Sequence, residues 1–154
     1  MLSTSTGGTS PVQGLPQTPG TIAWEAEIRK LPYFIQLTGE QREQFLITLT
    51  ARAILIGNFE QAEGQIWGSQ VRILEHLNRN PAGVPLSTLK DMFYEPAKKQ
   101  FPEAFGPYTF ENYMRFLESQ RLISVVGGNA NLTDQGREYL VWRVEQRKAD
   151  KVGL

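Results

Sequence analysis

The change from helical to strand periodicity between residues 108 and 132 constrains the fold of this chain more than any other feature of its sequence. Apolar residues first recur at helical spacing, at Phe110, Tyr113, Met114 and Leu117. A β-branched run, Ile123–Val126, then begins almost at once. Gly127 and Gly128 follow, and glycine readily adopts the positive φ angles that a tight strand reversal needs. The pattern predicts a helix followed by a short hairpin that pairs residues 123–126 with residues 130–132.

Two further helices are expected before this segment and one after it. The first helix ends at the turn-forming residues 80–83, and Ser87 is a suitable N-cap for the second. The last helix starts at Asp134, directly after the hairpin. Three helices, a hairpin and a closing helix are typical of a winged helix-turn-helix domain. We therefore predict a mainly α fold, a winged helix-turn-helix with a short two-stranded β-wing. The connection over residues 95–108 is much longer than the turn of about three or four residues in a plain helix-turn-helix.

The N-terminal part is predicted to be a helical extension behind a flexible leader. Residues 1–20 are rich in Ser, Thr, Gly, Pro and Gln and cannot bury enough apolar surface to become ordered. Pro32 ends a first helix, and Thr38 with Gln41 forms a capping box for the next. A break is expected at Ile56-Gly57, after which two helices or one bent helix both fit the pattern. The predicted divisions are a leader over 1–20, a helical extension over 21–66 and a winged-helix domain over 67–148.

Composition excludes several kinds of site. The chain has no cysteine, so it can form neither disulfides nor thiolate metal sites, and His76 is its only histidine. No spacing of nucleophile, base or paired carboxylates suggests catalysis. We expect a non-enzymatic protein without a metal or cofactor. The first residues lack a secretory signal and no apolar run has membrane-spanning length, so we expect a cytoplasmic location without a membrane partner.

Charge argues against tight non-specific binding to nucleic acid. The formal net charge is zero. Residues 1–65 carry four basic and six acidic side chains, or −2, which leaves +2 for the remainder. Affinity for the phosphate backbone scales with the number of phosphates neutralised, and neither half has a strong basic excess. Binding would therefore depend on a local patch.

The outward face of the helix after Thr109 is the best candidate for such a patch. Thr109 caps the helix, whose free amides suit a phosphate. Asn112 and Arg115 can read base edges, whereas Glu111 and Glu118 on the same face repel phosphates. A protein-interaction face or a merely solvated face is the alternative. The predicted nucleic-acid-binding residues are Lys98, Lys99, Tyr108, Thr109, Asn112, Arg115, Asn129 and Asn131. Both wing asparagines could equally be turn residues that tolerate a left-handed backbone.

Apolar residues on the terminal helices suggest self-association. The last helix carries Tyr139 and Trp142 on one side and another apolar stripe opposite, and only one side can close the core. We expect a homodimer, since symmetric dimers are the commonest oligomers, with Trp24, Phe45, Tyr139 and Trp142 in its interface. If Trp142 packs within its own chain, against Trp24 or Phe45, the protein is a monomer.

Residues 78–128 resemble the LOTUS (OST-HTH) variety of winged helix. The matching positions are Gly83, Pro85 and Leu86 before the second helix and Phe105 and Gly106 before the third. The resemblance implies an RNA-binding or helicase-binding module. Residues 132–140 instead look like the wing-to-helix junction of many bacterial transcription regulators. The leading hypothesis is a module that binds nucleic acid, RNA or DNA; the rival is a protein-interaction or assembly module that does not.

Overall fold

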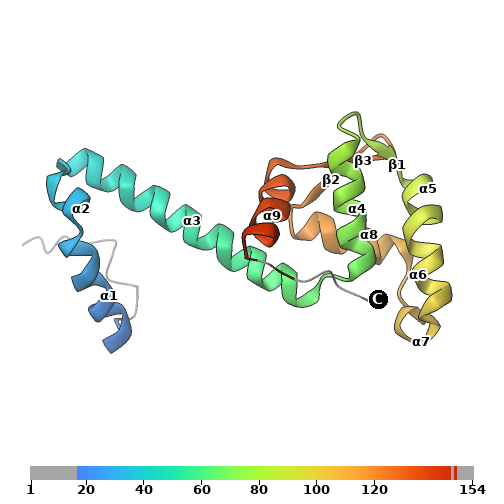
Figure 1. The fold of residues 1–154 in the computed structure, drawn as a ribbon, viewed down its shortest axis with the longest axis horizontal. Coiled ribbons are helices and arrows are strands. Elements are labelled where there is room, and N and C mark those ends of the chain that lie inside the picture. Colours follow the sequence, from blue (N-terminus) through green and yellow to red (C-terminus); the bar gives the residue numbers. More distant parts are fainter. Residues whose placement is uncertain (1–16, 147, 149–154) are drawn as a thin grey trace, which may run out of the picture. The chain divides into compact units, whose positions relative to one another are not determined.

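The computed structural model describes residues 17–146 and Lys148 (Figure 1). Most of the predicted leader, residues 1–16, lies outside the described residues. The chain divides into two compact units, one up to Ala51 and one from Arg52 onward. This division falls inside a long helix, α3 (Gly39–Gln65), whereas the sequence suggested a boundary at Ile66.

Unit 1, the part up to Ala51, contains α1 (Pro19–Lys30), α2 (Pro32–Gln36) and the first half of α3. The predicted leader was too long, because Pro19 and Gly20 already belong to α1. Thr18 ends the leader instead: its hydroxyl accepts a hydrogen bond from the Thr21 amide at 3.2 Å, and proline at the first helical position is preset for the helix.

The capping box predicted before α3 is confirmed. The Thr38 amide donates to Oε1 of Gln41 at 2.9 Å, and the Gln41 amide donates to the Thr38 hydroxyl at 3.4 Å. Within unit 1, Phe45 packs against Tyr33 and Phe34 of α2, with ring centroids 5.5 and 5.9 Å away. These contacts hold α2 on the start of α3.

The break predicted at Ile56-Gly57 is wrong. Helix α3 continues through Gly57, and the chain turns only at Trp67, whose backbone is extended before α4 (Gly68–Arg79) begins. Of the two alternatives left open, separate helices are therefore correct. The reason is tertiary: Phe59, Ala62 and Ile66 recur at helical spacing and are buried in unit 2, which outweighs the modest helix propensity lost at one glycine.

Unit 2, the part from Arg52 onward, confirms a mainly helical fold with a short β-wing. After α4 its elements are β1 (Val84–Pro85), α5 (Leu86–Leu89), the π-helical turn η1 (Lys90–Tyr94), α6 (Glu95–Gln100), α7 (Pro102–Phe105), α8 (Phe110–Ser119), β2 (Ile123–Val126), β3 (Asn129–Leu132) and α9 (Asp134–Glu145) (Figure 1). The long connection before α8 is thus itself helical, since α6 and α7 occupy it.

The wing forms as predicted, but its sheet has three strands rather than two. Strands β2 and β3 are antiparallel, with Val126 opposite Asn129. Gly127 and Gly128, both at positive φ, make the two-residue turn between them. Strand β1 pairs with the other edge of β3. The sequence did not indicate β1 because it is only two residues long and includes Pro85, which an edge strand tolerates.

Ser87 is not the N-cap predicted for the second helix. The helix begins at Leu86, directly after β1, and no side chain caps it. Leu86 instead donates its amide hydrogen to the Gly128 carbonyl at 3.0 Å, so the wing turn supplies the partner.

Tyr139 and Trp142 lie in the core of unit 2, which corrects their assignment to a dimer interface. Both rings pack against Phe59 of α3, at 5.5 and 5.6 Å between centroids. Tyr139 is fully buried and Trp142 is nearly so. Trp142 therefore packs within its own chain, but against Phe59 rather than against Trp24 or Phe45. None of the described helices combines the length and hydropathy that a membrane crossing requires.

Candidate nucleic-acid interface

Helix α8 presents the face that its sequence predicted. The side chains of Phe110, Tyr113, Met114 and Leu117 are buried. Thr109 is the N-cap, and its hydroxyl accepts a hydrogen bond from the Asn112 amide at 3.2 Å. Asn112 and Arg115 are exposed on the opposite side, together with Glu111 and Glu118. The cap and the amphipathic spacing thus decide which side chains α8 offers to a partner.

Two buried polar residues of α4 fix the position of α8. Gln70 donates its side-chain amide to the Tyr113 carbonyl at 2.8 Å, and the Tyr113 hydroxyl donates to Oγ of Ser69 at 2.8 Å. Both α4 side chains are almost inaccessible to solvent. Burial, only partly offset by the Ser69 hydrogen bond, raises the pKa of Tyr113 far above its usual value. The sequence pattern missed these two residues because single polar positions on a helix carry no sign of their partner.

A chain of contacts gathers four of the predicted residues at the N-terminal end of α8. The Lys98 ammonium lies 5.7 Å from the centre of the Tyr94 ring, and that ring packs against Phe110 at 5.4 Å. Tyr94 donates its hydroxyl hydrogen to the Tyr108 carbonyl at 2.5 Å. The contacts continue to Asn112, whose carbonyl accepts the Tyr108 hydroxyl at 3.3 Å. Partial burial raises the pKa of Tyr108. Lys98, Tyr108, Thr109 and Asn112 therefore share one small region.

Tyr94 joins these residues, although the sequence pattern does not mark it as part of the site. It is almost fully buried and it contacts Phe105, Phe110 and Tyr113. No sequence signal marked it, because its η1 turn was expected to be an ordinary helix. Its role is structural, since its ring contacts both the Lys98 ammonium and Phe110, the first residue of α8.

The electrostatics of the α8 face are mixed. The pKa of the Glu111 carboxyl is lowered, first by interaction with its own backbone amide, then by the Thr109 hydroxyl and by the charges of Lys90 and Arg115. Glu111 therefore stays ionised near the free amides of α8, where it competes with an incoming phosphate. Lys90 also lies 3.9 Å from Glu95, on the exposed surface. The face suits a few phosphate contacts rather than a broad phosphate-binding surface.

Three other predicted residues lie on neighbouring elements. Lys99 is exposed on α6 and Asn129 is exposed on β3. Asn131 is half-buried and packs closely on Gly83. Its Oδ1 lies 2.5 Å from the position that a Cβ atom would occupy if residue 83 were not glycine. Neither asparagine has a left-handed backbone, so that alternative explanation is wrong: Gly127 and Gly128 provide those angles. Neither asparagine belongs to the contact chain at the start of α8, and Lys99 adjoins it only as the chain neighbour of Lys98.

A pocket of about 240 Å³ lies elsewhere in unit 2, between α4 and α9. Its charged lining residues are Glu75, Arg79, Arg143 and Lys148. Arg143 and Lys148 are already paired with carboxylates of α3, Glu63 at 2.8 Å and Glu60 at 3.3 Å. The pocket therefore has little positive charge to offer an anion.

No cluster of metal-ligating side chains occurs among the described residues. His76 packs its ring against Phe93, with 5.4 Å between the ring centroids. No protein-family model, curated protein or solved structure matches this chain.

Proposed function

We propose that the chain is a non-enzymatic winged-helix module that binds nucleic acid, RNA or DNA, through the N-terminal end of α8. The observation that carries this proposal is the contact chain that gathers Lys98, Tyr108, Thr109 and Asn112 there. Arg115 follows one turn later on the same exposed face. A helix N-terminus with a nearby lysine suits a phosphate, and exposed Asn and Arg side chains suit base edges.

The charge of the chain sets the expected mode of binding. With a net charge of zero and acidic groups on α8, only a few phosphates can be neutralised. We expect modest affinity with a shallow salt dependence, so base contacts would contribute a large part of the binding free energy. A single-stranded or structured RNA offers exposed base edges, in line with the LOTUS resemblance.

Fluorescence titration tests this proposal. Labelled single-stranded RNA, structured RNA and duplex DNA are titrated at low and moderate salt with the wild-type chain and with Arg115→Ala and Lys98→Ala. Each variant should bind more weakly by roughly tenfold, and Lys98→Ala should also lower the salt slope by about one. Arg137→Ala is the matched control, because this exposed cation lies on α9 beside Asp134 and should leave binding unchanged. Absence of saturable, salt-sensitive binding to all three nucleic acids would contradict the proposal.

A second candidate function is protein interaction through the same face. The observation that favours it is the pair of exposed carboxylates, Glu111 and Glu118, beside Arg115. Replacing both with Gln separates the candidates. Affinity for nucleic acid should rise several-fold if the α8 face meets phosphates, because two repulsive charges are removed. A double variant that binds nucleic acid no better than the wild type favours the protein partner.

A further inference from the structure

Unit 1 forms helices but has no buried core. No residue from 17 to 51 is buried, although this segment forms α1, α2 and the first half of α3. Isolated units of fewer than about 40 residues rarely bury enough surface to be stable without a metal, disulfides or a partner. The chain has no cysteine. The helices of unit 1 therefore need another surface to cover them.

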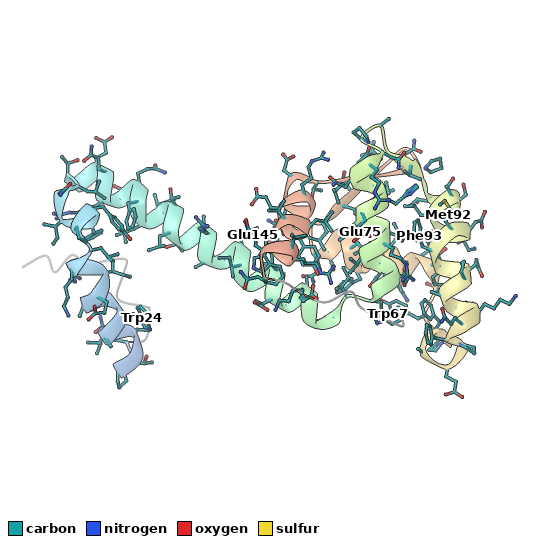
Figure 2. The ribbon with its side chains drawn as sticks, viewed as in Figure 1. Trp24, Trp67, Glu75, Met92, Phe93 and Glu145 are labelled. Carbon is teal, nitrogen blue, oxygen red and sulfur yellow. The ribbon has the colours of Figure 1, made fainter. Side chains whose placement is uncertain are left out.

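The exposed apolar side chains of unit 1 are large and numerous. Trp24 of α1 is 71% exposed (Figure 2), and Ile47 of α3 is 54% exposed. The other exposed large apolar residues of this unit are Ile22, Tyr33, Ile35, Leu46 and Leu49. Single exposed apolar residues are ordinary on protein surfaces, but seven within 35 residues are typical of an interaction surface.

Apolar residues emerge on two sides of α3. Leu46 and Leu49 are three residues apart and share one side of the helix, whereas Ile47 lies roughly 100° away from Leu46. Phe45 packs against Tyr33 and Phe34. This packing leaves Leu46, Ile47 and Leu49 exposed. A helix that is apolar on several sides is normally buried. One covering element is therefore insufficient, and a pair of helices is required.

We infer that unit 1 is a dimerisation arm whose partner is unit 1 of a second copy of this chain. Seven large apolar side chains, each about half exposed and of roughly 200 Å² when fully exposed, offer on the order of 700 Å². A stable interface buries about 800 Å² on each partner, so two arms supply the surface that a dimer needs. A second arm also brings its own helices, enough to cover α3 on both sides. The inference is independent of whether α8 binds nucleic acid.

The charges of unit 1 permit this self-association. Between residues 17 and 51 there are four carboxylates and three basic side chains, so two copies do not repel strongly. Lys30 pairs with Glu27 at 2.8 Å, and Arg42 donates hydrogen bonds to the carbonyls of Phe34 and Ile35. The few basic groups do not favour an anionic lipid surface, for which a helix usually carries many lysines and arginines. A symmetric dimer uses the same patch twice, as this surface requires.

Analytical ultracentrifugation of the whole chain tests the inference. At micromolar concentration the expected mass is twice that of one 17.4 kDa chain. The double variant Leu46→Glu/Leu49→Glu should raise the dissociation constant by roughly 100-fold or more, because four unpaired carboxylates would be buried per dimer. The control is the double variant Gln44→Glu/Thr48→Glu, which adds the same charge on the side of α3 formed by Gln41, Gln44 and Thr48. This control should remain a dimer.

A second measurement keeps the inference falsifiable if the double variant loses helix in unit 1. Because the chain lacks cysteine, Ala51→Cys gives a single site for a spin label in the wild-type background. Double electron–electron resonance should then detect a defined distance between the spin labels of the two copies. A mass of one chain without an inter-copy distance would overturn the inference, and so would a dimer unaffected by charges at positions 46 and 49. A monomer that co-sediments with phosphatidylserine vesicles would assign the arm to a membrane surface and would also overturn it.

Discussion

Tyr139 donates its phenolic hydrogen to the Glu63 carboxylate, with 2.5 Å between the two oxygens. Arg143 donates from Nε to the same carboxylate oxygen at 2.8 Å, and the side chains of this ion pair are only 7% and 11% exposed. These three residues join α3 to α9 within unit 2. Arg143 lies in the last turn of α9, where a cation also suits the helix dipole, and its side chain is paired inside the molecule.

Glu63→Gln should lower the free energy of unfolding by about 3 kcal/mol, because it removes the carboxylate charge that pairs with the buried Arg143 guanidinium. Glu60→Gln is the matched control, three residues earlier on α3. Its partner Lys148 lies at 3.3 Å in a more exposed pair, so the cost should stay below about 1 kcal/mol. Urea denaturation at pH 7 measures both. Equal losses in the two variants would show that burial does not strengthen the Glu63 contact.

Stability should fall at high pH because two tyrosines hold their protons more tightly in the folded chain. Burial raises the pKa of Tyr139 above its usual 10.0, and the Glu63 hydrogen bond and charge raise it further; burial likewise raises the pKa of Tyr113. The stabilisation is complete below pH 10 and is lost as the pH rises above it, where the unfolded chain releases these protons first. Urea midpoints between about pH 9 and 11 should show the decline. Tyr139→Phe should make it shallower; an unchanged slope would rule out this residue as its source.

Gly136→Ala should cost several kcal/mol, since a Cβ there would lie 2.1 Å from the carbonyl oxygen of Leu122, which is backbone and cannot move aside cheaply. Gly57→Ala is the opposite case. This glycine lies in α3 with no atom within 4 Å of the added Cβ, so alanine should stabilise the helix by about 0.5–1 kcal/mol. Thermal denaturation of both variants checks the two signs. A neutral Gly136→Ala would mean that α9 and the strand-side backbone at Leu122 are less closely packed than described.

Thr109→Asp separates the capping role of this residue from a binding role. Aspartate is as good an N-cap as threonine, so the melting temperature should change little, whereas Thr109→Ala should cost about 1 kcal/mol. If phosphate meets the start of α8, the added negative charge should weaken nucleic-acid binding by at least tenfold. The same titrations used for Arg115→Ala measure this effect. Full affinity in Thr109→Asp would place the phosphate elsewhere.

Local signals in the sequence predicted several elements well. The capping residues Thr38 and Thr109, the helical spacing of α8 and the two glycines of the wing all act within a few residues of one another. Such features depend on φ preferences and nearby hydrogen bonds, which the chain carries wherever it folds. The exposed face of α8 could be predicted for the same reason, because the cap and the amphipathic spacing of a helix decide which side chains it exposes.

Long-range packing decided what those signals could not. Gly57 is a local reason to end α3, yet the burial of Phe59, Ala62 and Ile66 carries the helix past it. A two-residue strand containing Pro85 becomes part of a sheet only because β3 offers it an open edge. The apolar character of Tyr139 and Trp142 indicated that each needs a covering surface, but not which one. That choice depends on contacts about 80 residues apart in the chain, such as Glu63 with Arg143, and the free energy of such contacts exists only once the tertiary structure has formed.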